Sequence, residues 1–291
     1  MPLAETGALV AAAAAGRRAV AAFNIITLEH AEAVVTGAES AGSPVVLQIS
    51  ENAVKYRHGR VRPLARAAAE AAAEARVPVA LHLDHVTSGR LLRKAADAGF
   101  SSVMYDAAHL PYAENLTATR SAADWAHANG LWIEAELGEV GGKGGAPPLD
   151  AHAPGARTDP EEARAFVEGT GVDALAVAIG SSHAMTARTA TLDHALLARL
   201  AGALAVPLVL HGSSGVPDGE LTAAVTGGIA KVNIGTALNL AMTSAIRDYL
   251  AANADAVDSR KYLSLGRRAM AETVTALIGV LRDAGEPAPV G

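Results

Sequence analysis

The amino-acid sequence predicts a (β/α)8 barrel with extra helices at its C-terminal end. Eight short apolar runs, each suited to a buried parallel strand, alternate with Ala-rich stretches that have the length of helices. No G-x-G-x-x-G pattern follows the first run, which disfavours the main competing fold, an open doubly wound sheet. Because neither a repeat nor a linker interrupts the alternation, we expect a single domain over residues 1–291.

The individual elements follow from these runs and from the Gly and Pro residues that bound them. Strands are expected at 20–24, 44–50, 77–84, 101–106, 131–137, 173–179, 206–211 and 229–234. Helices are expected at 28–41, 63–75, 89–98, 113–128, 191–204 and 217–226, with another that starts at a Thr158 or Asp159 cap and a helical remainder interrupted around 255–261. The segment from Gly138 to about Arg157 is rich in Gly and Pro, and loops of this length are usually functional or mobile.

Composition excludes several classes of protein. The chain is 51% hydrophobic, so it can bury a large core, and its net charge of -6 argues against general nucleic-acid binding. It has no cysteine, so any metal must be held by His, Asp or Glu. No apolar run is long enough to span a bilayer, and the short run at 8–15 precedes its arginines, unlike a signal peptide. We therefore expect a cytoplasmic protein with no membrane or nucleic-acid partner.

Ionisable side chains stand at the ends of the expected strands. In a barrel of this type the active site lies at the C-terminal ends of the strands, so residues far apart in sequence would meet there. These residues are Asp84, His85, Asp106, Glu134, Glu136, His183 and His211. Three imidazoles with an open fourth position suit a catalytic Zn²⁺, although any one histidine could instead be a hydrogen-bonded structural residue. We assign that structural role to His82 and expect it to point away from Asp84.

Two glycine-containing loops predict a phosphate site. Gly212-Ser-Ser-Gly215 follows the seventh strand, and Asn233-Ile-Gly-Thr236 follows the eighth. Loops in these two positions commonly bind phosphate in such barrels, because backbone N–H groups and a helix start face the anion. Either loop alone could equally be an ordinary strand-to-helix turn.

A family resemblance runs almost from end to end. The motifs that carry it are Ala22-Phe-Asn-Ile25, Ile49-Ser-Glu-Asn-Ala-Val-Lys-Tyr56, His82-Leu-Asp-His85, Ser102-Val-Met-Tyr-Asp106, Glu134-Ala-Glu-Leu-Gly138 with Gly141-Gly142, Ala176-Val-Ala-Ile-Gly180 with His183, Leu208-Val-Leu-His-Gly-Ser-Ser-Gly215 and Lys231-Val-Asn-Ile234. In this order they resemble the class II, metal-dependent ketose-bisphosphate aldolases, which include fructose- and tagatose-bisphosphate aldolases.

The resemblance implies roles for individual residues. His85, His183 and His211 would bind one catalytic Zn²⁺, and Asp84 would exchange a proton with the C4 hydroxyl or aldehyde oxygen. Asp106 and Glu136 match residues near an alternative metal position, and a monovalent cation could also bind. The residues expected to contact substrate are Asn24, Ser50, Gly180, Gly212, Ser213, Asn233, Gly235 and Thr236, with Arg260 at the distal phosphate. Relatives are commonly oligomers, so we expect a homodimer or homotetramer.

The expected reaction is reversible cleavage of a phosphorylated ketose to dihydroxyacetone phosphate and an aldehyde. Fructose 1,6-bisphosphate is the first candidate and tagatose 1,6-bisphosphate the second; another phosphorylated sugar, a metal-dependent hydrolase and a non-catalytic sugar-phosphate-binding barrel remain alternatives. An imine mechanism would require a lysine in the barrel, and among the lysines only Lys231 lies in an expected strand.

Two departures from the family pattern bear on substrate identity. His183 is followed by Ala184, where relatives have glycine, and the added methyl group restricts φ. Gly141-Gly142 is followed by Lys143, where many relatives have acidic residues. A proton-transfer acid would then have to come from elsewhere, such as Glu139, or that step differs.

Overall fold

The computed structural model describes residues 3–138 and 156–284. Eight parallel strands form a closed barrel in sequence order, with β8 paired to β1. The strands are β1 (Val20–Asn24), β2 (Val45–Ser50), β3 (Val79–Val86), β4 (Ser102–Tyr105), β5 (Trp132–Leu137), β6 (Ala174–Val177), β7 (Leu208–Leu210) and β8 (Ile229–Ile234). The predicted (β/α)8 barrel is confirmed, and all eight strands lie within or close to their predicted ranges.

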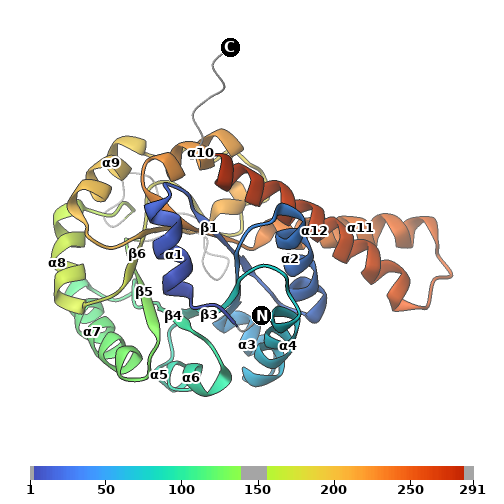
Figure 1. Ribbon diagram of the computed structural model, residues 1–291, viewed down its shortest axis with the longest axis horizontal. Helices are drawn as coiled ribbons and strands as arrows, with labels where there is room; N and C mark the ends of the chain where they lie inside the picture. The colour runs from blue at the N-terminus through green and yellow to red at the C-terminus, as the bar shows by residue number, and fades with distance from the viewer. Residues whose placement is uncertain (1–2, 139–155, 285–291) are drawn as a thin grey trace, which may run out of the picture.

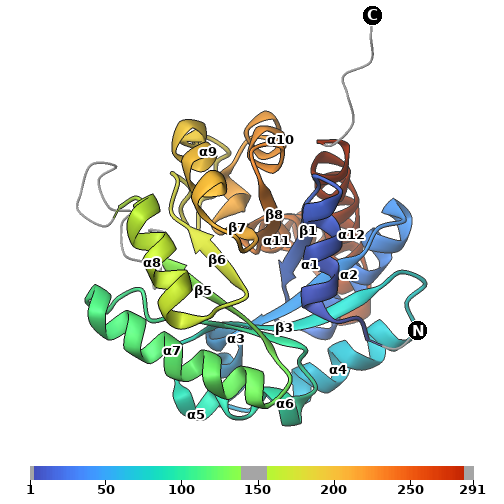
Figure 2. The ribbon, with the colours of Figure 1, turned by 60° about the vertical axis from the view of Figure 1, so that its left-hand side comes forward.

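Helices surround the barrel, as Figures 1 and 2 show. They are α1 (Thr6–Ala15), α2 (Leu28–Ala41), α3 (Glu51–Tyr56), α4 (Arg62–Ala73), α5 (Gly89–Leu92), α6 (Ala95–Ala98), α7 (Tyr112–Ala128), α8 (Pro160–Thr170), α9 (His194–Ala203), α10 (Asp218–Thr226), α11 (Thr236–Ala252) and α12 (Ser259–Asp283). None of the helices within the described ranges is long and apolar enough to cross a membrane.

Three local predictions need correction. The expected helix at 89–98 is two short helices, because the backbone tightens to an i to i+3 hydrogen bond from Lys94 N–H to the Leu91 carbonyl. The interruption near the C-terminus lies at 253–258. Helix α1 was not expected, because its run of alanines has no apolar stripe that would mark a buried face.

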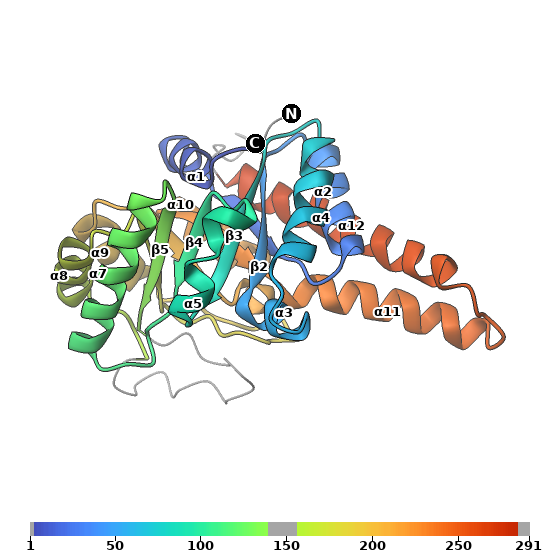
Figure 3. The same ribbon diagram turned by 90° about the horizontal axis from the view of Figure 1, so that it is seen from below.

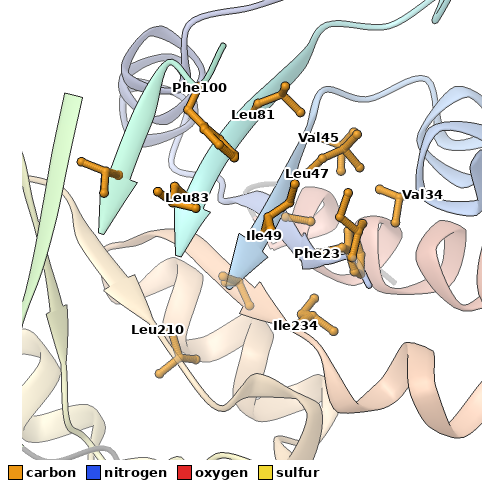
Figure 4. Close-up of a cluster of buried hydrophobic side chains, with 14 of the residues drawn as sticks. Phe23, Val34, Val45, Leu47, Ile49, Leu81, Leu83, Phe100, Leu210 and Ile234 are labelled. Atoms are coloured by element: carbon orange, nitrogen blue, oxygen red, sulfur yellow. The ribbon is translucent and has the colours of Figure 1, made fainter. Parts of the chain in front are cut away.

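Side chains alternate along the strands between the barrel interior and the surrounding helices. Large apolar residues such as Phe23, Leu47 and Leu81 face outward and pack against the helices (Figure 4). Inward-facing residues near the strand starts are small, such as Ala22 and Ala80, and a cluster with Val10 of α1 fills this end. The barrel is therefore packed with apolar side chains at its N-terminal end.

Toward the C-terminal ends of the strands the barrel interior becomes polar. Gln48, His82, Glu134 and Lys231 are all completely buried there. Burying polar and charged groups is costly without partners, and each of these four side chains makes at least one side-chain hydrogen bond. The candidate site lies directly above this polar layer.

Helices α11 and α12 form an arm that projects from one side of the barrel (Figure 3). The two helices pack against each other, and α12 also packs against α2. These are the extra C-terminal helices that the sequence predicts. The arm exposes large apolar side chains, including Leu240, Leu250 and Val257.

Candidate active site

The end of β3 is distorted, and this distortion brings two neighbouring side chains to one cavity. Adjacent residues of a regular strand point to opposite faces, yet Asp84 and His85 both line the cavity at the barrel mouth. The β3–β4 register shifts between Leu83 and Val86, and His85 has φ +48°. A non-glycine residue in this left-handed region has a conformational cost of about 1–3 kcal/mol, which contacts with the surrounding structure must offset.

Three histidines from separate strand ends meet beside a glutamate. One ligand atom from each of His85, Glu136, His183 and His211 lies within 4.8 Å of the others. The three imidazole rings are mutually edge-on, with centroids 4.8, 5.0 and 5.8 Å apart. The predicted histidines therefore converge, although they come from the ends of β3, β6 and β7.

Carboxylates orient two of these histidines. The Nδ1 atom of His85 lies 2.8 Å from Asp106 Oδ2, which leaves Nε2 to face the cluster. The Nε2 atom of His211 lies 2.8 Å from Glu134 Oε1, and the Lys231 ammonium donates to Glu134 Oε2 at 2.8 Å. Such carboxylate contacts fix the tautomer and ring orientation of metal-binding histidines. Asp106, which we expected near an alternative metal position, thus lies behind His85 and outside the four-residue cluster.

The electrostatics of this region favour a bound cation. Asp84, Asp106, Glu134 and Glu136 are all buried here, and the buried Lys231 ammonium pairs with Glu134. Burial lowers the pKa of His211, but Glu134 and Glu136 on either side raise it overall to about 9. Three imidazoles and a carboxylate are a donor set that Zn²⁺ accepts. The residues present therefore fit a divalent metal.

Asp84 is held by an amide relay from the neighbouring strands. The Asn24 side chain donates from Nδ2 to Asp84 Oδ2 at 2.8 Å, and Gln48 donates from Nε2 to Asn24 Oδ1 at 3.0 Å. Burial raises the pKa of the Asp84 carboxyl, but the nearby His85, His211, His82 and Lys231 outweigh this and lower it below 3.8. Asp84 is therefore an ionised, oriented carboxylate at neutral pH, which suits a general base.

His82 does not point away from Asp84, contrary to our expectation. Residues two apart in a strand share a face, so His82 also points into the barrel, one layer below Asp84. It is fully buried, and its Nδ1 lies 2.7 Å from Ser102 Oγ. Its structural role is thus consistent with the geometry, whereas its predicted orientation is wrong.

The buried His82 predicts acid sensitivity. Burial, followed by the charge of Lys231, lowers its pKa from 6.5 to about 3. Below pH 6.5 the unfolded chain takes up a proton that the folded protein excludes, so stability should fall by about 2 kcal/mol between pH 7 and pH 5 through this residue. Denaturant unfolding of wild type and His82→Gln at both pH values would measure the difference. An equal loss of stability in both proteins would contradict it.

A cavity of about 280 Å³ opens beside the histidine cluster. The predicted residues that line it are Asn24, Ser50, Asp84, His85, His183, Gly212, Ser213, Asn233, Gly235 and Thr236. Gly212 has φ +66°, and a Cβ there would lie 2.6 Å from the Ser182 backbone. Only glycine fits this close approach, so the two loops after β7 and β8 form one side of the cavity with accessible backbone.

Other predicted residues lie elsewhere. Gly180 has φ +126° and packs against the Thr191 carbonyl, so its role here is to allow close packing. Arg260 is the second residue of α12, with 88% of its side chain exposed, and pairs with Asp258. Glu139 and Lys143 lie outside the described residues.

Sequence reasoning missed several residues of the cavity. These are Ile26, Asn52, Ser182, Ser214 and Asn239. His30 is also buried, and its Nε2 lies 3.2 Å from Asn239 Oδ1. The sequence offered one indication of Asn239, namely its position in the first turn of the helix that follows β8. Ala184 also lines the cavity, and its backbone is left-handed, with φ +58°. The alanine that replaces the family's glycine therefore adopts a conformation that glycine would adopt more readily.

Comparisons with known proteins agree with this geometry. Residues 4–286 match the family described as fructose-bisphosphate aldolase class-II. The chain belongs to this family. A probable fructose-bisphosphate aldolase of Bacillus subtilis is 38% identical over 98% of both chains, and a fructose-bisphosphate aldolase of Geobacillus stearothermophilus is 39% identical over 93% of this chain and 92% of the relative.

Solved structures give the same result for this class II aldolase. The YdjI aldolase of Escherichia coli K12 superposes with a TM-score of 0.81 at 32% identity, covering 96% of this chain and 97% of the other. A putative fructose-1,6-biphosphate aldolase of Coccidioides immitis gives 0.84 at 30% identity, covering 96% and 98%. The protein is therefore an aldolase, a carbon–carbon lyase whose family is typically metal-dependent and acts on phosphorylated sugars, as the resemblance implied.

Proposed function

We propose that this class II aldolase reversibly cleaves fructose 1,6-bisphosphate to dihydroxyacetone phosphate and glyceraldehyde 3-phosphate, with one Zn²⁺ held by His85, His183 and His211. The observation that carries the proposal is one cavity lined together by ionised Asp84, by two histidines of the cluster and by the glycine loops after β7 and β8. The relatives named fructose-bisphosphate aldolase support this substrate. Glu136, which belongs to the cluster, would serve an alternative metal position, and Asp106 would orient His85 beside it.

The residues of the cavity divide the work of the reaction. The backbone N–H groups around Gly212, Ser213 and Thr236 would bind the phosphate of the ketone end, with Ser50 and Asn233 contacting the sugar. Asp84 would remove the C4 hydroxyl proton as the C3–C4 bond breaks, and would return it in the condensation direction. When bound, the metal would act as a Lewis acid for the negative charge that develops on the ketone-derived fragment.

The geometry disfavours a mechanism through a lysine imine. Lys231 is completely buried, donates to Glu134, and is absent from the cavity lining. A carbonyl carbon in the cavity would therefore have no access to its amine. The metal-dependent route is the one that the accessible residues support.

Metal removal tests the proposed reaction. We expect chelator treatment to abolish triose phosphate release from fructose 1,6-bisphosphate and added Zn²⁺ to restore it, because cleavage requires the Lewis acid. The assay would follow triose phosphate with a coupled dehydrogenase before and after dialysis against chelator. Cleavage by metal-free protein would contradict the proposal and redirect attention to Lys231. No cleavage by zinc-loaded protein would reject this substrate, and tagatose 1,6-bisphosphate would be tested next.

We also propose that the working enzyme is a homodimer or homotetramer and that Arg260 binds the distal phosphate within it. Arg260 stands on the projecting arm, away from the cavity of its own chain, so substrate contact would require the arm of another copy. The exposed apolar side chains of the arm are consistent with such a contact. The cytoplasmic location expected from the sequence remains a prediction.

Arg260→Ala should raise KM for the bisphosphate by about 10–100-fold, because charge-assisted hydrogen bonds contribute roughly 1.5–3 kcal/mol. Fructose 1-phosphate, which lacks the distal phosphate, is the matched control substrate and should be cleaved equally by both proteins. Sedimentation analysis would report the oligomeric state. An equal effect on both substrates would show that Arg260 acts on something other than the distal phosphate.

A further inference from the structure

The strained end of β3 requires an anchor. His85 occupies the left-handed region, and the β3–β4 register shifts around it, so the segment does not hold its shape through regular pairing alone. The backbone continues through Thr87 and Ser88, and the Ser88 side chain then caps α5 by accepting from Leu91 N–H. Whatever fixes Thr87 and Ser88 therefore fixes the direction in which Asp84 and His85 leave the strand.

One buried carboxylate binds this segment. Glu51 Oε2 accepts from Thr87 N–H at 2.7 Å and from Ser88 N–H at 3.2 Å, and Oε1 accepts from the Thr87 hydroxyl at 3.1 Å. The Lys55 ammonium lies 3.0 Å from the same Oε1. Glu51 is only 7% exposed, so these donors, rather than water, satisfy its two oxygens.

The position of Glu51 in the fold suits this role. Ser50 ends β2 and is paired in register with Asp84, and its side chain caps α3 by accepting from Ala53 N–H. Glu51 follows as the first residue of α3, which packs against both β2 and β3 (Figure 3). Its side chain therefore reaches from one strand end to the next at the level of the cavity.

We propose that Glu51 is a positioning residue whose carboxylate holds the bulged end of β3 and keeps Asp84 and His85 directed into the cavity. It lines no part of that cavity, so it acts on the metal site through backbone alone. The proposal rests on the proposed function only for its catalytic consequence. The expected effect of Glu51 on metal binding depends only on the histidine cluster and not on the identity of the substrate.

The contacts require an ionised carboxylate of this length. All the neighbours of Glu51 named above are donors, so a glutamine would turn an N–H₂ group toward at least one of them. An aspartate keeps the charge but is one methylene shorter, and cannot reach both backbone amides. The two substitutions Glu51→Gln and Glu51→Asp therefore remove the contact in different ways.

The test compares both variants with wild type and with Lys55→Ala. Lys55 is 65% exposed and its removal leaves the amide contacts intact, so this variant controls for loss of the ion pair. Zinc affinity would be measured by competition with a chromophoric chelator, and amide hydrogen exchange over residues 84–92 would be measured in metal-free protein. We expect about 10–100-fold weaker zinc binding and faster exchange at Thr87 and Ser88 in both Glu51 variants, with neither change in Lys55→Ala.

The outcomes separate the proposal from a general loss of stability. A variant that melts near the wild-type temperature, binds zinc weakly and exchanges faster only over this segment supports it. Wild-type zinc affinity in a folded Glu51 variant overturns it, and so does weakened binding without a change in exchange at 84–88. Neither readout uses a sugar substrate, so failure of fructose 1,6-bisphosphate cleavage would leave this test unaffected. Should Glu51→Gln not fold, Glu51→Asp provides the same comparison.

Discussion

Asp84→Asn is expected to lower kcat for ketose-bisphosphate cleavage by about 10²–10⁴-fold, the usual contribution of a positioned general acid–base group. An amide has the same shape as the carboxylate but cannot accept the C4 hydroxyl proton. Its oxygen can still accept from Asn24, so the local structure should survive. Steady-state kinetics with the zinc-loaded protein would measure the effect.

Metal content and a partial reaction distinguish loss of the base from loss of the site. Asp84 is not among the four residues whose ligand atoms cluster, so the variant should bind zinc with wild-type stoichiometry. Exchange of a carbon-bound proton of dihydroxyacetone phosphate with solvent does not involve the C4 oxygen, and should persist. If zinc is lost together with activity, or if the exchange disappears with cleavage, Asp84 has a different role from the one assigned to it.

The barrel could be predicted because its signal is local and repeated. Each buried parallel strand is an apolar run, and Gly or Pro residues mark its limits, so eight strands could be placed without knowledge of their contacts. The predictions that were wrong or missing concern elements whose form depends on contacts with other parts of the fold. The helix at 89–98 is interrupted by a tightened turn. Helix α1 could not be predicted because its apolar face is defined only by its packing against the N-terminal end of the barrel.

The metal cluster could be predicted for a related reason. Parallel strands bring their C-terminal ends together, so histidines at three such ends must approach one another. The layer beneath could not be predicted in the same way. That Glu134 contacts both His211 and Lys231 depends on side-chain reach across the barrel, which strand assignment alone does not give. The bulge at His85 likewise has no signature in a chain without glycine at that position.

Lys231→Met is expected to destabilise the metal-free protein by about 3–5 kcal/mol, because it leaves the buried Glu134 carboxylate without its ammonium partner. Methionine fills a similar volume, so the effect reports the lost charge more than a cavity. For a domain of this size such a change should lower Tm by roughly 5–8 °C. Thermal and denaturant unfolding in the presence of chelator would measure it without a contribution from metal binding.

The double variant Lys231→Met/Glu134→Gln is the matched control. Glutamine removes the buried charge but can still accept from His211 Nε2, so the second substitution should recover much of the stability lost in the first. Because His211 would then face a neutral acceptor, the same double variant should bind zinc more weakly than wild type even where its stability is restored.

A single variant with wild-type Tm, or a double variant less stable than the single one, would mean that the Lys231–Glu134 pair does not stabilise the buried polar layer beneath the site. Separate recovery of stability and loss of zinc affinity would show that the pair does two things: it neutralises a buried carboxylate, and that carboxylate orients the histidine above it.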